Sequence, residues 1–374
     1  MKIGTITFHC SYNFGSALQA YALQTYLTRQ GNDVHIIDYR SSDFDAYKLF
    51  RMKGIRSFAV DLFSLPGNLK RRKSFHNFWG KYFNLTERMY AGPSAEEQLS
   101  ADASAYDAII CGSDQIWNLD CTHGPVPPFF LSFAPDRALK ISYAPSLAHP
   151  TFEKQFFTQQ DKDNIAHWLN RFDSISVREI PVAGQFEALT DKPFTETVDP
   201  TLLLEADDYK TIQSEELPKN LKSGQYIFAY TLWPNDDMVQ YIDDLAKKYN
   251  KTIVYYSKRR IRYTAKSINV WGVGPAEFLS LIAEADSVIS NSFHATVFSI
   301  LYNKPFLTFG MGKTSSRMRT LLNHLDFPAG HLLPDDFKGG NGIEPFASEL
   351  DLGKLGKLRE KSERFLSEAL QPKM

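Results

Sequence analysis

Short apolar runs rich in β-branched residues alternate along the chain with stretches of helical periodicity. This alternation is typical of a parallel sheet covered by helices. The first segments predict a strand at residues 2–8 (KIGTITF), an amphipathic helix at 16–30 that ends at Gly31, and a strand at 33–40 (DVHIIDYR). The chain therefore opens with a β-α-β unit.

The first series of strands is interrupted near the middle of the chain. Further strands are predicted at residues 106–117, 138–146 and 174–179. Pro200 and an acidic cluster then break the pattern in the segment VDPTLLLEADDY, residues 198–209. We expect a domain boundary there, which gives an N-terminal domain of residues 1–205 and a C-terminal domain of residues 206–374.

A second α/β series follows the boundary. Strands are predicted at residues 225–233, 252–257, 287–290 and 305–309, and helices at 236–249, 275–285, 294–302 and, with leucines on one side, 352–370. The predicted fold class is α/β, with two Rossmann-like domains facing a central cleft. In such sheets ligands collect beyond the carboxyl ends of the strands, so the strand-to-helix turns are the places to search.

Composition and charge narrow the function classes. A length of 374 residues exceeds what one hydrophobic core usually supports, in agreement with two domains. The 42 Lys and Arg residues balance 43 Asp and Glu residues, so no global charge attracts nucleic acid or an anionic membrane. A local exception is the basic and aromatic stretch 47–81. This stretch indicates either a solvated helical face or a surface for an anionic saccharide or lipid carrier.

Cysteine usage and the start of the chain indicate the compartment. Cys10, Cys111 and Cys121 are too few and too scattered for a disulfide framework or a zinc site, and small core residues explain them. Met1 leads directly into the first strand without a signal-peptide pattern, and no 18-residue apolar run follows. We expect a cytoplasmic protein, with peripheral contact at the inner face of the membrane.

Three apparent motifs fail on spacing or specificity. Gly312-Lys313-Thr314 resembles a phosphate-binding loop, but the glycine required five residues earlier is Leu307. The segment GVGPAE after Trp271 lacks the third glycine of a dinucleotide fingerprint. The Asp-Phe-Asp at residues 43–45 is a common pattern, and no His-x-x-x-His or Cys-x-x-Cys occurs. We therefore expect no metal site.

His294 follows a predicted strand and good N-cap residues, so it is expected in the first turn of a helix at a strand's carboxyl end. The helix dipole there favours an anion and disfavours a charged imidazole. A bound phosphate would reverse that preference, which makes His294 a candidate general acid that is charged when substrate binds. The alternative is a histidine packed on the sheet and hydrogen-bonded to a carbonyl.

Six segments in a fixed order carry a family resemblance: YNFGSALQAYALQTYL, CGSDQIWN, SYAPS, ISVRE, VDPTLLL and SNSFHATVFSILYNKPFLTFG. Together they span about Ile3 to Lys313 and resemble the polysaccharide pyruvyl transferase family. The resemblance implies a fold like that of the GT-B glycosyltransferases. It also implies transfer of the enolpyruvyl group of phosphoenolpyruvate to two hydroxyls of one sugar, with release of phosphate. Such pyruvate ketals add a carboxylate to bacterial capsules, exopolysaccharides and cell-wall polymers.

The implied chemistry defines what the site must contain. Protonation of the methylene carbon of phosphoenolpyruvate creates an oxocarbenium at the next carbon, a sugar hydroxyl attacks it, phosphate leaves, and a second hydroxyl closes the ring. One general acid, cations for a phosphate and a carboxylate, and a group that orients hydroxyls are sufficient. We therefore expect no cofactor beyond the donor substrate, an acceptor side in the first domain and a phosphoenolpyruvate side in the second.

Two residues match the family's donor site. His294 matches the motif histidine and is the candidate acid. Arg178, in SVRE at a strand's carboxyl end, matches the donor-binding arginine, and its planar fork suits a carboxylate or phosphate. The alternative for Arg178 is an ion pair with Glu179 or Asp173.

Three residues are candidates for a second cation at the donor. Lys313, after the next predicted strand, approximates a lysine at similar spacing in family members, and Arg317 and Arg319 compete for that role. Many members carry a basic residue in an Arg-x-His arrangement, whereas this chain has Ser292 at that position. Either Lys313 and a nearby arginine supply the missing charge, or donor binding differs in this subgroup.

The acceptor side is expected in two turns of the first domain. Asp114, in GSDQIWN, is a candidate catalytic residue that accepts hydrogen bonds from acceptor hydroxyls, or else a helix N-cap. The first strand-to-helix turn either frames the acceptor or only caps its helix, with Gly15 allowing close backbone approach. The candidates in this turn are Asn13, Gly15, Ser16 and Gln19.

Two other classes remain open. A GT-B nucleotide-sugar glycosyltransferase would use the same cleft and hold a diphosphate at the same helix N-terminus, with Glu284 as the nearest candidate for a ribose-binding acid. A non-catalytic saccharide-binding protein would keep the fold without turnover. Trp117, Trp233 and Trp271 near predicted strand ends are candidates for sugar stacking, although core packing is the commoner role of such residues.

Overall fold

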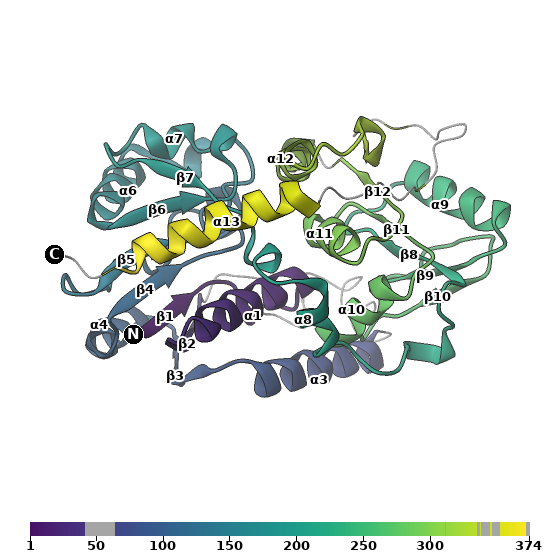
Figure 1. Ribbon diagram of the computed structural model, residues 1–374, viewed down its shortest axis with the longest axis horizontal. Coiled ribbons are helices and arrows are strands. Elements are labelled where there is room, and N and C mark those ends of the chain that lie inside the picture. Colours follow the sequence, from purple (N-terminus) through teal and green to yellow (C-terminus); the bar gives the residue numbers. More distant parts are fainter. Residues whose placement is uncertain (42–63, 311, 335–336, 338–344, 346–351, 372–374) are drawn as a thin grey trace. The chain divides into compact units, whose positions relative to one another are not determined.

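The computed structural model describes residues 1–41, 64–310, 312–334, 337, 345 and 352–371 (Figure 1). The chain divides into two compact units. Among the described residues, the first unit contains 1–41, 81–204 and 353–371, and the second contains 64–80 and the described part of 205–352.

The first unit is built on a seven-stranded sheet with the order β3-β2-β1-β4-β5-β6-β7. All of its strand pairs are parallel, and Ile3 of β1 pairs with both Val34 of β2 and Ala108 of β4. The strands are β1 (Lys2–Ile6), β2 (Asp33–Arg40), β3 (Leu85–Ala91), β4 (Ala108–Cys111), β5 (Leu139–Ser142), β6 (Ser174–Val177) and β7 (Phe194–Glu196).

Helices between these parallel strands, and a further helix after the last strand of the chain, complete the first unit. They are α1 (Phe14–Arg29), α4 (Ala95–Asp102), α5 (Leu119–Thr122), α6 (Gln159–Arg171), α7 (Gly184–Glu187) and α13 (Leu352–Ala369). The helix predicted at residues 16–30 is α1, and Gly31 follows its end with φ +82°, in the left-handed region. Most of α1 is buried, so the helix is more enclosed than an amphipathic pattern implies.

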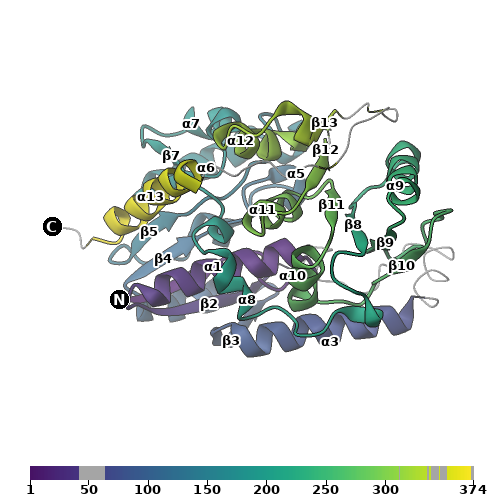
Figure 2. The same cartoon turned by 45° about the vertical axis from the view of Figure 1, so that its right-hand side comes forward.

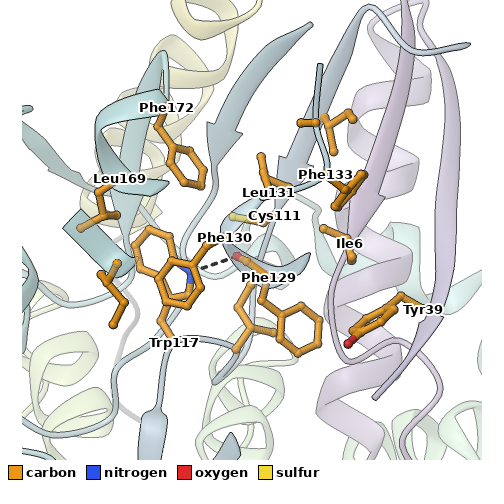
Figure 3. Packing of buried hydrophobic residues seen from close by; sticks show 14 of the residues in the cluster. Ile6, Tyr39, Cys111, Trp117, Phe129, Phe130, Leu131, Phe133, Leu169 and Phe172 are labelled. Atoms are coloured by element: carbon orange, nitrogen blue, oxygen red, sulfur yellow. Dashed lines mark hydrogen bonds between the residues drawn. The ribbon is translucent and has the colours of Figure 1, made fainter. Parts of the chain in front are cut away.

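The core of the first unit lies between the sheet and the segment after β4 (Figure 3). Trp117 is fully buried, its ring stacks on Phe130 at a centroid distance of 5.4 Å, and its Nε1–H donates to the carbonyl of Phe129 at 3.0 Å. Cys111 belongs to the same core. Trp117 is therefore a packing residue and is not placed to stack on a sugar.

The second unit repeats the pattern with a six-stranded parallel sheet, in the order β10-β9-β8-β11-β12-β13. Its strands are β8 (Tyr226–Tyr230), β9 (Thr252–Tyr255), β10 (Ser267–Asn269), β11 (Ser287–Ser290), β12 (Phe306–Phe309) and β13 (Leu332–Leu333). Its helices are α3 (Leu65–Tyr82), α8 (Ala206–Lys210), α9 (Asp236–Lys248), α10 (Pro275–Ala283), α11 (Phe293–Leu301) and α12 (Ser316–His324).

The units depart from the predicted division in two segments, although the boundary after Leu204 lies within one residue of the prediction. The terminal helix α13 belongs to the first unit, where Arg359 Nε donates to the carbonyl of Leu202 at 2.9 Å. Conversely, α3 belongs to the second unit, where Asn68 Oδ1 accepts from Trp271 Nε1 at 3.0 Å. The sequence pattern indicates amphipathic helices but not the surface against which each one packs.

Candidate functional site

Each sheet has a topological switch point, where successive strands are added on opposite sides. In the first unit this point lies between β1 and β4, and in the second it lies between β8 and β11. Loops at a switch point diverge beyond the carboxyl ends of the strands and leave room for a ligand.

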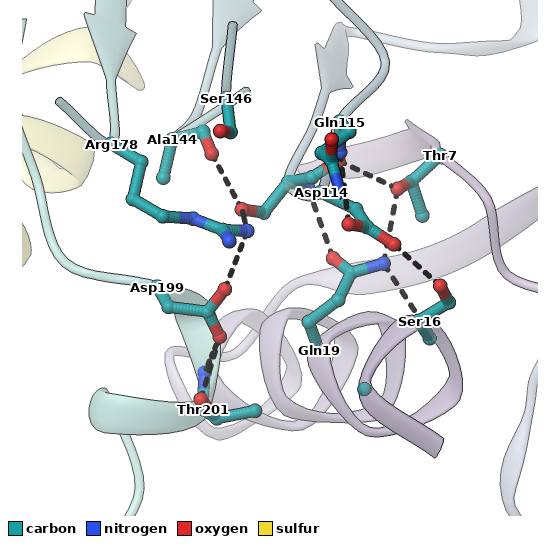
Figure 4. Close-up of polar contacts among 12 residues, drawn as sticks. Thr7, Ser16, Gln19, Asp114, Gln115, Ala144, Ser146, Arg178, Asp199 and Thr201 are labelled. Carbon is teal, nitrogen blue, oxygen red and sulfur yellow. Dashed lines mark hydrogen bonds and ion pairs between the residues drawn. The ribbon is translucent and has the colours of Figure 1, made fainter. Parts of the chain in front are cut away.

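The first strand-to-helix turn of the first unit is held by a side-chain cap. Asn13 Oδ1 accepts from the backbone N–H groups of Gly15 at 2.8 Å and Ser16 at 3.3 Å, so Asn13 is the N-cap of α1. Ser16 Oγ donates to Asp114 Oδ2 at 2.5 Å, and Asp114 Oδ1 accepts from the backbone N–H of Gln115 at 2.9 Å. Figure 4 shows Ser16 beside Asp114, and the Asn13 cap lies at the same end of α1.

Gln19 joins this turn to the one after β4. Its Nε2 donates to Thr7 Oγ1 at 3.0 Å, and its Oε1 accepts from the backbone N–H of Ser113 at 3.0 Å. Thr7 Oγ1 in turn donates to the carbonyl of Ser113 at 2.9 Å (Figure 4). Since both sides of this link are buried, it fixes Asp114 relative to the start of α1.

The turn after β4 requires glycine at its start. Gly112 has φ +119°, and a Cβ there would lie 2.1 Å from the carbonyl oxygen of Tyr143. Asp114 adopts φ +66°, also in the left-handed region, which Asp tolerates better than most residues. The Asp114 side chain is thus presented from a defined turn that only a glycine two residues earlier permits.

Arg178 is held by a buried ion pair. Its Nη2 lies 2.6 Å from Asp199 Oδ2 and donates to Ser113 Oγ at 2.6 Å, and its side chain is 3% exposed. Asp199 is itself oriented, because its Oδ1 accepts from the backbone N–H of Thr201 at 3.0 Å and from the Thr201 hydroxyl at 2.6 Å (Figure 4). Arg178 therefore supports the turn that carries Asp114.

Asp199, which forms this ion pair with Arg178, is neither of the two predicted partners. Asp173 is exposed and accepts from the backbone N–H of Lys140, and Glu179 Oε1 accepts from Ser146 Oγ. Asp199 was not among the predicted site residues, although its segment, VDPTLLL, is both the predicted domain boundary and one of the segments that carry the family resemblance. The sequence did contain a signal, since Asp two residues before Thr is the pattern of a carboxylate that bonds the backbone N–H two residues on.

A second buried carboxylate, Asp38 of β2, lies beside His9, which follows β1. Asp38 Oδ1 is 3.0 Å from His9 Nε2, and Arg40 donates to both Asp38 oxygens at 2.8 and 3.0 Å. His9, Asp38 and Cys10 bring potential metal-ligand atoms within 4.8 Å of one another. Because the Arg40 guanidinium already occupies both carboxylate oxygens, the geometry is that of an ion-pair network and fits a metal ion poorly.

The protonation of this pair follows from its contacts. Burial opposes ionisation of Asp38, but hydrogen bonds from His9 and Arg40 outweigh it and lower the pKa of Asp38 to about 2. Burial likewise opposes protonation of His9, but Cys10 and Asp38 outweigh it and raise its pKa to about 10. A lowered Asp pKa stabilises the fold above the ordinary Asp value, and a raised His pKa stabilises it below the ordinary His value.

Asp38→Asn is expected to lower the free energy of unfolding by about 2 kcal/mol at pH 5–6. The loss should shrink below about pH 4, where Asp38 of the unfolded chain is protonated, and again as the pH rises toward about 10, where His9 loses its proton. Urea unfolding of the wild type and the variant, from below pH 4 to about pH 10, measures this loss of free energy. Asp33→Asn is the control, because Asp33 forms a looser pair with His35 at 3.5 Å and is 62% exposed. Equal losses in the two variants would contradict the prediction.

The second switch point contains the segment that ends in His294. Ser290 Oγ donates to the carbonyl of Tyr230 at 2.6 Å and accepts from the backbone N–H of Ser292 at 2.9 Å. Asn291 Oδ1 accepts from the backbone N–H of Leu232 at 2.7 Å. These bonds tie the β8 and β11 loops together at the start of α11.

Ser292 and His294 are both in the predicted places. Ser292 is the N-cap residue of α11, and His294 lies in the first turn; each is 7% exposed. The His294 ring packs edge-on against Phe293 at a centroid distance of 5.2 Å. The guanidinium of Arg317, from α12, lies 5.8 Å from the centroid of the same Phe293 ring. Arg317 therefore adds a positive charge close to the first turn of α11.

The other predicted cations are distributed around the turn after β12. Lys313 lies in the 3-10 helix Gly312–Ser315, at the same sheet edge as His294 because β11 and β12 are parallel neighbours. The Lys313 side chain is outside the described part of the structure. Arg319 is exposed and lines a pocket of about 710 Å³ together with Leu322, Asn323 and Phe327 of the same unit. Of the two candidate arginines, Arg317 is the one that contacts Phe293, at the start of α11.

The remaining candidates separate by exposure. Trp271 packs against Tyr256 at 4.7 Å and beneath the Arg71 guanidinium at 4.6 Å, whereas Trp233 is 72% exposed. Glu284 is the residue that ends α10, at the edge of the sheet where the strands begin, so it is poorly placed to bind a ribose at the opposite edge.

Residues 43–45, the Asp-Phe-Asp, lie outside the described residues. Within the part of the chain that is described, no helix combines the length and apolar content that crossing a membrane requires.

Comparison with solved structures identifies the fold. The chain is similar to a putative UDP-N-acetylglucosamine 2-epimerase from Listeria monocytogenes (10% identity, TM-score 0.52, 99% of this chain and 89% of the other). It is similar to the UDP-GlcNAc 2-epimerase from Neisseria meningitidis bound to UDP-GlcNAc (10% identity, TM-score 0.52, 99% of this chain and 99% of the other). It is also similar to the UDP-GlcNAc 2-epimerase from Methanocaldococcus jannaschii (11% identity, TM-score 0.50, 98% of this chain and 100% of the other). At such identities these matches establish the fold alone, which is GT-B with two Rossmann-like domains.

The family follows from the sequence match. The family model of polysaccharide pyruvyl transferases matches residues 13–312, which is most of the chain. The chain therefore belongs to the polysaccharide pyruvyl transferase family, and it is a transferase. A comparison with proteins of curated function found no match.

Proposed function

We propose that this protein transfers the enolpyruvyl group of phosphoenolpyruvate onto two hydroxyls of a bacterial cell-surface saccharide and releases phosphate. The observation that carries the proposal is the position of His294, in the first turn of α11 at the carboxyl end of β11. A histidine in this position can give a proton to a substrate whose anionic groups bind at the helix N-terminus.

The donor would bind to groups of the second unit. The first-turn N–H groups of α11 suit the phosphate or the carboxylate, and Arg317 lies close to that turn. Arg317 and Lys313 are the proposed cations in place of the basic residue that the family resemblance implies at Ser292. His294 would protonate the methylene carbon. The resulting oxocarbenium is attacked by one sugar hydroxyl, phosphate leaves with the electrons of its C–O bond, and the second hydroxyl closes the ketal.

The acceptor would bind to groups of the first unit. Asp114 is the proposed residue that accepts hydrogen bonds from acceptor hydroxyls, and its orientation is set by Ser16 and by the turn that Gln19 and Arg178 support. Asn13 and Gly15 shape the same turn. Direct donor binding by Arg178 is a weaker proposal, because Asp199 already neutralises its guanidinium. The reaction as proposed needs no metal and no redox cofactor.

Atoms and charges balance in this reaction. Each of the two acceptor hydroxyls loses one proton. One of these protons restores the acid, which gave its own proton to the new methyl group, and the other leaves with phosphate. The acceptor therefore gains the mass of one pyruvate less one water. Contact with the inner face of the membrane is also a proposal.

Phosphate release from phosphoenolpyruvate, measured with a panel of free and lipid-linked bacterial saccharides, tests the proposal. We expect release only when an acceptor is present, together with the stated mass gain on that acceptor. Parallel reactions contain nucleotide sugars in place of phosphoenolpyruvate. Release of a nucleoside diphosphate there, with no phosphate from phosphoenolpyruvate with any acceptor, would replace the proposal with a GT-B glycosyltransferase.

A further inference from the structure

The second unit concentrates positive charge in a chain whose formal net charge is −1. The sequence contains no Asp or Glu from residue 62 to 86 or from residue 245 to 276. The first stretch includes α3, with four consecutive basic residues at 70–73. The second includes the segment after β9, where Arg259, Arg260 and Arg262 are exposed. The near-zero net charge of the whole chain therefore hides a local excess of positive charge in these two stretches.

One face of α3 is open to solvent. The exposed positions of α3 include a row at helical spacing, Pro66, Leu69, Lys70, Lys73, His76 and Asn77, and the neighbouring Arg72 is exposed as well. Leu69 is 51% exposed, although it lies beside two lysines. Arg71, on the opposite side of the helix, packs over Trp271. The outer face therefore combines cations with an apolar side chain, as interfacial helices do.

The basic segment after β9 adjoins α3. The Arg71 guanidinium lies 6.0 Å from the ring centroid of Tyr256, the residue that follows β9. Asn269 Nδ2 donates to the carbonyl of Ser257 at 2.7 Å, and Asn269 Oδ1 accepts from the backbone N–H of Trp271 at 2.9 Å. Figure 2 shows α3 beside the β10 end of the sheet.

These cations are not neutralised by carboxylates of the described residues. None of the described ion pairs includes Lys70, Arg72, Lys73, Arg259, Arg260 or Arg262. Asp243, which contacts the end of the segment after β9, is buried and accepts from the backbone N–H groups of Thr264 and Ala265 at 2.7 and 2.8 Å. Its charge is therefore satisfied within the fold.

We propose that a basic face, made of the exposed residues Lys70, Arg72 and Lys73 of α3 and Arg259, Arg260 and Arg262 after β9, docks on the surface of an anionic phospholipid bilayer. Each Lys or Arg at such a surface increases binding about fivefold. The exposed Leu69 favours a bilayer over a nucleic acid, because lipid removes this side chain from water and a phosphate backbone does not. The docking is independent of which donor the enzyme uses.

Co-sedimentation with vesicles tests this docking directly. Wild-type protein is expected to sediment with vesicles of phosphatidylglycerol and phosphatidylcholine, to stay in solution with pure phosphatidylcholine, and to be released by about 0.5 M salt. A variant with Lys70→Gln, Lys73→Gln, Arg259→Gln and Arg260→Gln is expected to bind at least about 100-fold more weakly.

A matched control carries the same change of charge at exposed residues elsewhere: Arg137→Gln, Lys154→Gln, Lys222→Gln and Lys361→Gln. The control should bind as the wild type does. Failure of the wild type to bind anionic vesicles, equal loss in both variants, or binding to single-stranded DNA without binding to vesicles would each overturn the proposal. The assay needs no turnover, so its failure is distinct from failure of the pyruvyl transfer.

Discussion

His294→Gln is expected to lower kcat for acceptor-dependent phosphate release by about 10²–10⁴-fold. Glutamine keeps a polar side chain of similar length in the first turn of α11 but cannot give up a proton. Because donor binding would rest on the helix N-terminus and the cations, KM for phosphoenolpyruvate should change much less than kcat. Steady-state phosphate release at saturating donor measures the effect.

His324→Gln is the control for that variant. His324 ends α12 in the same unit and is exposed, so the same substitution there should leave kcat unchanged. Unfolding curves of both variants separate lost chemistry from lost structure. If His294→Gln kept full kcat, a residue other than His294 would be the acid, and the position at the helix N-terminus would serve packing alone.

Asp199→Asn is expected to reduce the free energy of unfolding by about 3–5 kcal/mol, because it leaves the buried Arg178 guanidinium without its counter-charge. The hydrogen bonds to Thr201 can persist with an amide, so the loss should come mainly from the broken ion pair. Denaturant unfolding at neutral pH measures this change.

Asp173→Asn is the matched control for the ion pair. Asp173 lies just before β6, whereas Arg178 lies just after it, and Asp173 is exposed. The expected loss there is about 1 kcal/mol or less. If Asp199→Asn were no worse than this control but raised KM for phosphoenolpyruvate by a large factor, Arg178 would be a donor-binding residue and not a support of the Asp114 turn.

Most of the sheet could be predicted from the sequence because strands buried on both faces are continuous apolar runs. β1, β4, β8, β11 and β12 all lie at predicted positions. β3 (LTERMYA) was missed because it is an edge strand with exposed charged positions, and β13 because two residues give no periodicity.

The sequence predicts those site residues that lie in the turn directly after a recognisable strand. Asn13, Ser16 and Asp114 were expected in strand-to-helix turns at a sheet edge, and the structure brings them together. The partner of Arg178 was not predictable in this way, because Asp199 lies beyond the next strand, β7. The contact depends on how the β6 and β7 turns fold back, which no local pattern encodes.

The grouping of α3 and α13 was also beyond the sequence pattern. Both helices have helical spacing and charge, yet α3 packs on Trp271 of the second unit and α13 on the segment near Leu202 of the first. An amphipathic pattern specifies that a face is buried but not which surface covers it.

The product formed in deuterated water tests the central claim most directly. If the enzyme protonates the methylene carbon of phosphoenolpyruvate, the acceptor should gain a pyruvate ketal whose methyl group carries one deuterium. Nuclear magnetic resonance and mass spectrometry of the purified saccharide detect both features. An acceptor that instead gained a new glycosidic bond from a nucleotide sugar, or no ketal from phosphoenolpyruvate with any saccharide, would contradict the account.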